Sequence, residues 1–531
     1  MSDDGPPAET VGPFLRGLAV LGELAGHRAS AVPAGELARA TGIARSTLDR
    51  TVGTLAELGL VRVEDHRVTH TGALALPGNA FLASTRGLSG PVGAMADALA
   101  EEVDESVALS VPDGDSVRLA HLALRRRVVR VGFRPGDRLP VGRAAAGVLL
   151  TPGNGSPGPD GETGPARDGA GGVSRTGEGG GEPGLVSVAV QLSPWPGEDP
   201  VGALSVVSHR ARHDTDSLRA DLLPRMRECA AVMEERLRSD PGADGPHDDG
   251  RWWDATALHA AKERLGAEFV ESLARGPAVI AALETGRHGT TPAAVSRLLG
   301  LPRASVRRAL FSLRYTGHAV EEAGRWRLTP RVLGLGHSRA TRMTLADIAR
   351  PHLVALAGRV GESASLTVPA GPEGAEIRYV ARVATERIMS ADLGPGTRFP
   401  AYPTASGRVL LAGRDPIGRA RALRAIEPRA LTSHTVTDPA RLTALLDEVA
   451  RDGYAMGNEE LEVGLRSIAV PVRNGRGGTG EVVAAVNLAM PAGRRDPRRA
   501  RAELLPALRR AVEAIERELV PAARLHRVPT D

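Results

Sequence analysis

Two stretches of the chain carry the same spacing of apolar and polar residues, and each predicts a helix-turn-helix followed by a hairpin. In Thr290–Leu328, apolar residues fall on one side of a helix that begins near Arg303, and Gly300 ends the helix before it. Ala323-Gly324 then separates two short strands. The stretch Val32–Val68 repeats these features at an almost constant spacing. The pattern predicts two copies of a winged helix-turn-helix, a DNA-binding module.

The second copy presents the more basic surface. In the first copy Asp49 points outward beside the arginines, and the wing lacks the Arg-Trp-Arg run of the later copy. The alternative is an amphipathic helix pair whose basic face is only solvated. Lys262 is the only lysine and arginine is used almost everywhere else, so an arginine by itself is weak evidence of a DNA contact. The residues that we expect to contact DNA are Arg45, Ser46 and Arg50 in the first copy, and Arg303, Ser305, Arg307, Arg308, Arg325 and Arg327 in the second.

Outside these modules the chain repeats itself again. PGDRLPVGRAAAGVLL, residues 135–150, matches PGTRFPAYPTASGRVL, residues 395–410, and GLVSVAV at 184–190 matches GLRSIAV at 464–470. We therefore expect an internal duplication. Its parts are a first winged helix over 10–83, an α/β domain over 84–239 with a flexible Gly- and Pro-rich insertion over 151–184, a linker over 240–264, a second winged helix over 265–335 and a second α/β domain over 336–531.

Composition limits the setting in which the protein works. With 531 residues the chain is long enough for several domains, and a formal net charge of +4 means that any DNA-binding surface is local. One cysteine, Cys229, leaves no intramolecular disulfide. The acidic N-terminus has no apolar segment of the secretory kind, and no apolar run is long enough to span a membrane. We expect a cytoplasmic protein.

Several longer stretches together resemble the IclR family of bacterial transcription regulators, among them LTPRVLGLG, ARPHLVALAGRVGESASLTV, YVARVATERIMSADLGPGTRFPAYPTASGRVLLAG and LTSHTVTDPARLTALLDEVARDGYAMGNEELEVGLRSIAVPV. The resemblance covers nearly all of 265–520 and, in degenerate form, about 12–238. It implies an α+β multidomain fold, with two winged helices and two GAF-like effector domains. The wording around Ile388-Met389 and Gly396–Ala405 is most similar to regulators of protocatechuate and aromatic-acid catabolism.

The resemblance implies an allosteric regulator that binds operator DNA as a homo-oligomer and responds to a small organic acid. Where many family members carry an acidic residue before the Glu-Glu pair, this chain has Gly457-Asn458, which leaves the effector's identity open. An alternative for the polar strand residues is that Ser467 and Asn487 bond each other or backbone, and that Arg466 pairs with Glu459 or Glu460. By motif, the effector-binding residues are Phe399, Tyr402, Ala405, Asn458, Arg466, Ser467 and Asn487.

An enzyme is the first rival interpretation. GRGGTG, residues 475–480, fits a nucleotide-binding pattern in form, yet it joins two predicted strands and opens no helix. The sequence contains no H-E-x-x-H, C-x-x-C or G-x-S-x-G, so we expect no catalytic residue, no cofactor and no metal. The second rival is a ligand sensor or interaction scaffold whose winged helices mainly dimerise.

Two further expectations concern the duplication. The two winged helices should pair within one chain, because they share one polypeptide. Only the second effector domain should bind the small molecule. The first has Leu139, Gly142 and Val186 where the second has Phe399, Tyr402 and Arg466, and it lacks an equivalent of 431–461.

Overall fold

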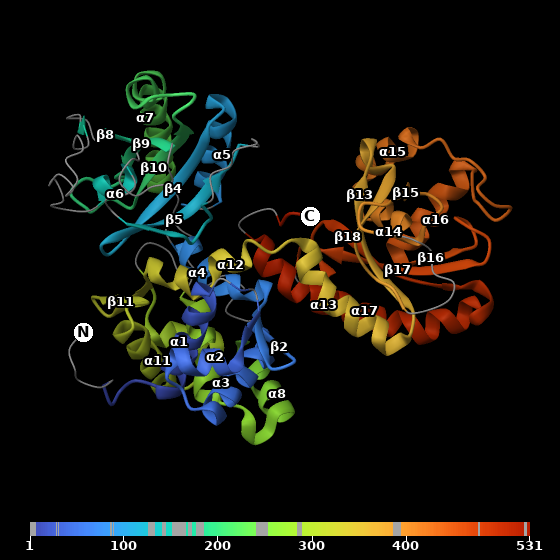
Figure 1. Cartoon of the computed structure of the whole chain (residues 1–531), viewed down its shortest axis with the longest axis horizontal. Coiled ribbons are helices and arrows are strands. Elements are labelled where there is room, and N and C mark those ends of the chain that lie inside the picture. The colour runs from blue at the N-terminus through green and yellow to red at the C-terminus, as the bar shows by residue number, and fades with distance from the viewer. Residues whose placement is uncertain are drawn as a thin grey trace. The chain divides into compact units, whose positions relative to one another are not determined.

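The computed structural model describes residues 7–27, 29, 31–84, 88, 90–125, 133–140, 145–150, 166–167, 172–176, 185–239, 253–283, 289–385, 394–475, 478–524 and 528–530. The chain divides into two compact units, Met1–Arg342 and Met343–Asp531 (Figure 1). The first unit contains both winged helices and one large sheet, and the second contains the other large sheet. The fold is α+β, with the two winged helix-turn-helix regions and two effector-type sheets that the sequence predicts.

The first winged helix has the predicted order of elements. Gly42 joins two helices in the left-handed conformation, φ 67°, which glycine adopts without strain. Leu48, Val52 and Leu55 face the core, as predicted. Its elements are α1 (Gly12–Gly26), β1 (Ala31–Pro33), α2 (Ala34–Thr41), α3 (Arg45–Glu57), β2 (Val61–Glu64) and β3 (Arg67–His70), with η1 (Gly72–Ala75) and α4 (Leu76–Ser84) after them.

The second winged helix confirms the prediction in the same detail. The Thr291 hydroxyl caps its second helix by accepting a hydrogen bond from the Ala294 amide at 3.3 Å, and Gly300 (φ 65°) makes the turn. Val306 and Leu310 are fully buried. The elements are α9 (Glu271–Ala282), α10 (Pro292–Leu299), α11 (Arg303–Tyr315), β11 (Ala319–Glu322) and β12 (Arg325–Leu328), followed by η5 (Pro330–Leu335) and α12 (His337–Ala340).

The two winged helices pack against each other through equivalent positions of their first helices. A Cβ atom on Gly17 of α1 would come within 2.2 Å of the Leu273 side chain of α9. A Cβ atom on Gly276 of α9 would come within 2.0 Å of the Phe14 ring of α1. Gly17 aligns with Gly276, and Phe14 with Leu273, so the contact is made twice with the partners exchanged.

Two hydrogen bonds repeat the same exchange. The amide of Val11, just before α1, donates to the Ser312 hydroxyl of α11 at 2.8 Å. The amide of Val270, just before α9, donates to the Thr54 hydroxyl of α3 at 3.0 Å. Val11 aligns with Val270, and Thr54 with Ser312. The pair is thus organised like an isologous dimer inside one chain, and the prediction that the winged helices pair within the chain is confirmed.

One helix of the first unit is absent from the sequence analysis. The expected linker 240–264 contains most of α8 (Ala255–Leu265), which leads into η4 (Gly266–Glu268). The carboxylate of Asp254 caps α8 by accepting from the Ala257 amide at 2.9 Å. Residues 240–252 of the linker lie outside the described residues.

The first large sheet has seven strands in the order β6-β5-β4-β10-β9-β8-β7. Most of the insertion 151–184 lies outside the described residues. Within it, β8 pairs antiparallel with β9, so the expectation that this segment holds no ordered strand is wrong there. Backbone hydrogen bonds to a free sheet edge need no apolar side chains. The elements are α5 (Pro91–Val103), β4 (Ser106–Asp113), β5 (Ser116–Ala123), β6 (Arg138–Pro140), α6 (Ala145–Leu150), β7 (Ala166–Arg167), β8 (Gly172–Thr176), β9 (Leu185–Leu192), β10 (Gly202–His209) and α7 (Thr215–Ser239).

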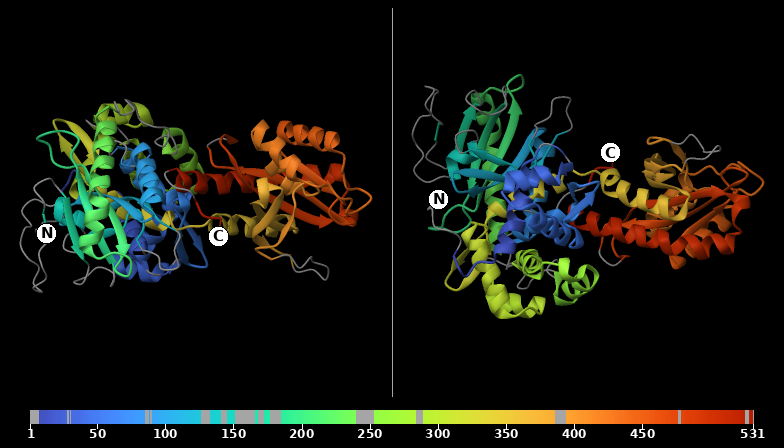
Figure 2. Two further views of the ribbon diagram at one scale, coloured as in Figure 1. Left: turned by 90° about the horizontal axis from the view of Figure 1, so that it is seen from above. Right: turned by 60° about the horizontal axis from the view of Figure 1, so that its bottom comes forward.

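The second large sheet has six strands in the order β15-β14-β13-β18-β17-β16. Figures 1 and 2 show α13 and α17 side by side, and their apolar residues pack against one face of this sheet. The opposite face packs against α14 and α16. The elements are α13 (Leu345–Val360), β13 (Ser363–Ala370), η6 (Pro372–Gly374), β14 (Glu376–Val383), β15 (Arg398–Pro400), α14 (Ala405–Ala412), α15 (Pro416–Ala425), α16 (Pro439–Asp452), β16 (Ala455–Asn458), β17 (Leu465–Arg473), β18 (Val482–Pro491), η8 (Ala492–Arg494) and α17 (Pro497–Ala523).

The connection between the second winged helix and this sheet is made by two helices and not by one. The structure has α12, then a turn, then α13. Thr344 and Asp347 form a reciprocal capping box at the start of α13, with the Asp347 amide donating to the Thr344 hydroxyl at 3.1 Å. These caps satisfy backbone groups that a continuous helix would satisfy internally, so a new helix begins here.

Candidate functional site

The outward face of α11 is the most basic surface among the expected DNA-contacting elements. Arg303, Arg307 and Arg308 are all exposed, and α11 contains four arginines and no acidic residue. The guanidinium of Arg307 lies 5.5 Å from the centroid of the Phe311 ring on the same helix. Within the described residues, neither Arg303 nor Arg308 forms an ion pair. These cations are available to phosphates and base edges.

Ser305 lies on the same helix, but its hydroxyl already has a hydrogen-bond partner within the protein. Its hydroxyl accepts a hydrogen bond from Arg275 of α9 at 3.0 Å, and Arg275 also pairs with Glu271. Ser305 is half-buried. The structure therefore separates it from the exposed arginines and uses it to join α11 to α9.

The wing holds its two candidate arginines close to the protein. Arg325 donates to the backbone carbonyl of Gly289 at 3.1 Å, and Arg327 pairs with Glu322 across the hairpin. Trp326, between them, packs edge-on against Phe311 of α11 with ring centroids 5.9 Å apart. Since exposed ion pairs contribute little free energy, a phosphate can displace Glu322 at small cost.

The first recognition helix, α3, has a weaker basic face. Arg45 pairs with Asp49 one turn along, with Arg45 Nε 3.1 Å from the carboxylate. Arg50 donates to the backbone carbonyl of Ala267 at 3.0 Å, and Ser46 is exposed. The helix contains two arginines and two acidic residues. Its candidate cations already have partners in the protein.

In the second sheet, Arg466 and Asn458 do not lie with the other effector candidates. Arg466 lies on the same face of β17 as Ile468, two residues along, and Ile468 packs in the cluster with α13 and α17. Adjacent strand residues point to opposite faces, so Arg466 and Ser467 cannot share a face. Arg466 donates to Asn458 Oδ1 at 2.8 Å and to the Ala492 carbonyl at 2.7 Å. The alternative in which Arg466 pairs with Glu459 or Glu460 is not found among the described residues, where Arg466 bonds Asn458 and the Ala492 carbonyl.

The face covered by α14 collects polar groups that the sequence analysis names only in part. Asn487 lies there at 4% exposure, and its amide nitrogen donates to the Ser365 hydroxyl at 3.5 Å. Among the described residues, Asn487 Oδ1 and the buried Ser406 hydroxyl have no hydrogen-bond partner. Over the same described residues, no hydrogen bond joins Ser467 to Asn487. Ser365 and Ser406 are residues that sequence reasoning missed, although polar residues in apolar elements could have indicated them.

Aromatic side chains form the wall beside these polar groups. Tyr402 is buried, and its hydroxyl donates to the Arg429 carbonyl at 2.6 Å and accepts from the Arg429 amide at 2.9 Å. Phe399 packs edge-on against Tyr379, with ring centroids 6.1 Å apart. Burial raises the pKa of the Tyr379 hydroxyl. Tyr402, Phe399 and Ala405 thus belong to one apolar cluster, as expected.

A buried ion pair holds this region together and was not predicted. Arg408 of α14 binds both carboxylate oxygens of Glu460, with Nη1 2.8 Å from Oε1. Its Nε also donates to the Tyr402 carbonyl at 2.9 Å. Both side chains are almost fully buried, so Arg408 is neutralised and cannot serve as a free cation for a ligand.

Gly457 of β16 packs closely against Ser467 and the start of α14. A Cβ atom there would lie 3.1 Å from the Ser467 hydroxyl and 3.5 Å from the Ala405 amide nitrogen. Any larger residue would have to occupy the space between Ser467 and the start of α14. The glycine that departs from the family pattern therefore faces the candidate effector site.

The first sheet offers a poorer polar set at the corresponding positions. Ser205 pairs with Ala108 in the register that joins Asn487 to Ser365 in the second sheet. Its buried hydroxyl has no hydrogen-bond partner among the described residues. Gly142, which aligns with Tyr402, lies outside the described residues, as does the segment with Ile388-Met389. Leu139 and Val186 lie on β6 and β9.

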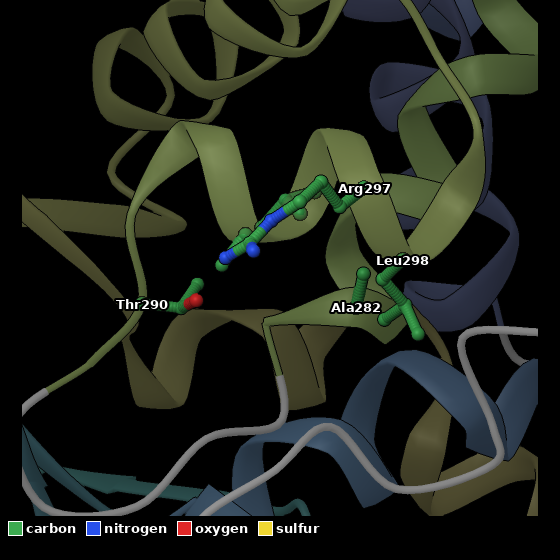
Figure 3. Close-up of a pocket in the computed structure, with 6 residues that line it drawn as sticks. Ala282, Thr290, Arg297 and Leu298 are labelled. Atoms are coloured by element: carbon green, nitrogen blue, oxygen red, sulfur yellow. The ribbon is translucent and has the colours of Figure 1, made fainter.

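A pocket of about 340 Å³ lies in the second winged helix, between the end of α9 and α10 (Figure 3). Residues 284–288, which connect these helices, lie outside the described residues, so we assign no site there. The lining residues are Ala282, Thr290, Ala294, Val295, Arg297 and Leu298.

Comparison with known families agrees with this division of the chain. The model described as the IclR helix-turn-helix domain matches twice, at residues 15–65 and 272–322. The model described as the C-terminal domain of the bacterial transcriptional regulator IclR matches residues 337–517. The chain belongs to the IclR family. It is a DNA-binding transcriptional regulator and not an enzyme.

The similar proteins within the IclR family include regulators of aromatic catabolism. The Pca regulon regulatory protein of Pseudomonas putida is 40% identical over 228 residues, which are 43% of this chain and 76% of the relative. The p-hydroxybenzoate hydroxylase transcriptional activator of Acinetobacter baylyi is 28% identical over 253 residues, 47% of this chain and 92% of the relative. A solved Rhodococcus regulator is 40% identical, covers 48% of this chain and 99% of its own, and has a TM-score of 0.42.

Two observations complete the description of the IclR-type chain. In the part of the chain that the structure describes, no helix combines the length and apolar composition needed to cross a membrane. Over the same residues, His, Cys, Asp and Glu side chains do not gather in groups of three that could hold a metal ion.

Proposed function

We propose that the second effector domain binds a small aromatic carboxylate on the α14 side of its sheet, and that binding changes the affinity for operator DNA. The observation that carries the proposal is Asn487. An amide oxygen buried without a partner costs ~1–3 kcal/mol, so a ligand hydroxyl that donates to Oδ1 recovers that free energy. A phenolic hydroxyl on the ring of the acid is a suitable donor.

The other end of the ligand would meet neutral donors. Ser406 has an unpartnered hydroxyl, and the Ala405 amide lies at the start of α14, where backbone N–H groups favour an anion. Arg466 is on the opposite face, and Arg408 is bound to Glu460. The carboxylate is therefore held by hydroxyl and backbone donors without a free cation.

The aromatic class follows from the walls of the site. Tyr379, Phe399 and Tyr402 supply apolar surface beside Asn487 and Ser406. Two relatives are named for the Pca regulon and for p-hydroxybenzoate hydroxylase, which supports a hydroxybenzoate as the effector.

We further propose that the protein acts in the cytoplasm, and that α11 with its wing makes the sequence-specific DNA contacts. The contacts are assigned to Arg303, Arg307 and Arg308, with Arg325 and Arg327 on phosphates. The exposed and acid-free face of α11 supports this choice. A purely dimerising role is favoured only for the first winged helix, whose cations have intramolecular partners.

The first effector domain should bind no acid. The loss of a strand-borne cation no longer supports this view, because Arg466 does not face the site. The remaining reasons are Ser205 in place of Asn487 and Leu139 in place of Phe399, which remove the amide and one aromatic wall.

Calorimetry on the full chain tests the proposal. 4-Hydroxybenzoate should bind at one site per chain, and more tightly than benzoate, which lacks the donor for Asn487. Asn487→Ala should abolish this preference and weaken 4-hydroxybenzoate on the order of 10- to 100-fold. Ser205→Ala, at the matching position of the first sheet, should change neither. Unaltered binding to Asn487→Ala would refute the assignment of the site.

A further inference from the structure

The pairing of the winged helices has consequences for the DNA that the chain reads. In an isologous pair each partner contributes the same contacts, and the two DNA-reading helices are related by the two-fold axis. Here the contacts Gly17–Leu273 and Gly276–Phe14 obey that rule, as do the two amide-to-hydroxyl hydrogen bonds. One polypeptide therefore contains both heads of the pair, α3 and α11.

The two heads differ in charge where a symmetric pair would be alike. The outward face of α11 carries Arg307 and Arg308 with no acid on the helix. On α3, the position of Arg307 is taken by Asp49, and Asp49 also pairs with Arg45. An acidic residue on the reading face repels phosphates and cannot accept from guanine, which presents acceptors in the major groove. The first head is thus a poor reader of sequence.

A segment of the chain also packs against α3. The residues 253–270, which include α8 and η4, bond to the C-terminal half of α3 and the turn after it. Trp253 Nε1 donates to the Leu58 carbonyl at 3.0 Å, Arg264 pairs with Glu57, and Ala267 accepts from Arg50 at 3.0 Å. The counterpart of this segment before α1 is the N-terminal stretch, of which 7–11 is described. Of that stretch, the Val11 amide donates to the Ser312 hydroxyl of α11 at 2.8 Å.

We propose that a single chain is a complete DNA reader with two unequal heads, which binds an asymmetric operator made of one strong half-site under α11 and one weak half-site under α3. The second head reads bases through Arg303, Arg307 and Arg308. The first head sets the position of the pair on the duplex and adds contacts to the backbone. This inference rests on the DNA-binding function of the family and is independent of the effector.

Selection of binding sites from random duplex DNA by the full chain provides the first test. The selected sites should share one well-defined half, whereas the other half should vary. Sedimentation on a single selected site should give one winged-helix pair, hence one chain, per operator. Perfect palindromes bound by two chains, each through its own α11, would overturn the proposal.

Substitutions separate the two heads. Arg308→Ala should weaken binding to the selected site on the order of 10- to 100-fold and relax the strong half. Arg50→Ala, at the position of α3 that aligns with Arg308, should weaken binding by less than about 3-fold and leave the selected sequence unchanged. Equal losses from the two variants would contradict unequal heads.

The pairing itself is tested at the glycine contacts. Gly276→Ala places a Cβ against the Phe14 ring, so hydroxyl-radical footprints should lose the weak half while the strong half persists. Phe14→Ala removes the ring, and the double variant should recover the full footprint, which gives a coupling between the two sites. Gly22→Ala on α1 is the control, because its Cβ would meet nothing within 4 Å.

A milder variant guards against loss of folding. Ser312→Ala removes the hydroxyl that accepts from Val11 and adds no volume. It should shorten the footprint in the same direction as Gly276→Ala, with unchanged circular dichroism. A folded protein that keeps the full two-part footprint in both Ser312→Ala and Gly276→Ala would refute the proposal.

Discussion

The two large sheets share one hydrogen-bonding frame but not one set of polar residues. From the edge inward, β6-β5-β4-β10-β9 repeats as β15-β14-β13-β18-β17. Within this frame Ser205 stands in the place of Asn487, and Val148 in that of Arg408. Small apolar residues are enough to maintain a frame of backbone hydrogen bonds, whereas a buried polar group must find a partner. The two copies have therefore kept the frame and differ at polar positions that a ligand or a buried ion pair requires.

The largest expected effect concerns the buried ion pair. Glu460→Ala leaves Arg408 buried without its partner, which should destabilise the second unit by ~3–5 kcal/mol. The four tryptophans lie in the first unit, at 195, 252, 253 and 326. Urea unfolding followed by circular dichroism should show an earlier transition that tryptophan fluorescence does not report.

The control for this comparison is an exposed pair on the same sheet. Glu376 lies 3.5 Å from Arg398, and both side chains are largely exposed. Glu376→Ala should change stability by less than ~1 kcal/mol. If both variants unfold at the same urea concentration, Arg408 does not depend on Glu460 as the geometry indicates.

The two winged helices should also differ in how their stability depends on pH. Burial, followed by the charges of Arg331 and Arg118, lowers the pKa of His318 to about 4. The folded state thus holds the proton less tightly than the unfolded state, so the stability contribution is present above pH 6.5 and is lost as pH falls toward 4. The expected loss is about 3 kcal/mol.

The matched variant for that prediction comes from the other copy, where Leu60 is buried at the position of His318. His318→Leu should remove this part of the pH dependence between pH 4 and 6.5. Urea midpoints at pH 7 and pH 4.5, read from the tryptophan fluorescence of the first unit, measure the difference. An equally steep loss of stability in His318→Leu would assign it to other groups.

A smaller effect is expected at Gly457, beside the start of α14. In the first sheet Arg175 of β8 takes the place of Gly457, because it pairs with Ser187 in the register that joins Gly457 to Ser467. Gly457→Asp should crowd Ser467 and the start of α14 and add a negative charge, which weakens a carboxylate effector on the order of 10- to 100-fold. Gly457→Ala should reduce affinity less. Calorimetry with 4-hydroxybenzoate compares the affinities of the two variants. Tighter binding to Gly457→Asp would contradict an anionic ligand.

The smallest effect is expected in the first sheet. Ser205 buries a hydroxyl that has no hydrogen-bond partner among the described residues, so Ser205→Ala should stabilise the first unit by up to ~1 kcal/mol. Thermal unfolding followed by tryptophan fluorescence is the measurement. A clear destabilisation would mean that the hydroxyl bonds to water or to a group outside the described residues.

The parts of the fold that could be predicted from sequence are those fixed by neighbours along the chain. Gly300, Ala323-Gly324 and the buried positions of α11 follow from turn chemistry and helical spacing. The interrupted connection before α13 was within reach, since Thr344 and Asp347 are a capping pair. So was the helix α8, which Asp254 caps.

The effector site was predictable only in part. Assigning Arg466 and Ser467 to one pocket neglected the period of a strand, which sends neighbours to opposite faces. The pair Arg408–Glu460 and the packing of Gly276 on Phe14 join residues far apart in the sequence, and no local pattern specifies them. The sequence suggests a domain boundary between residues 240 and 251, in the predicted linker. Dividing the protein there would separate the two winged helices that pack together in the structure.

The reciprocal glycine contacts also bear on how the protein behaves when it is scarce. A DNA-reading pair made from two chains comes apart on dilution, and operator occupancy then falls faster than the protein concentration. Gly17 and Gly276 belong to one polypeptide, so the association of the winged helices is unimolecular and does not depend on copy number. A cell that holds only a few molecules of this regulator still holds the same number of assembled DNA-reading pairs.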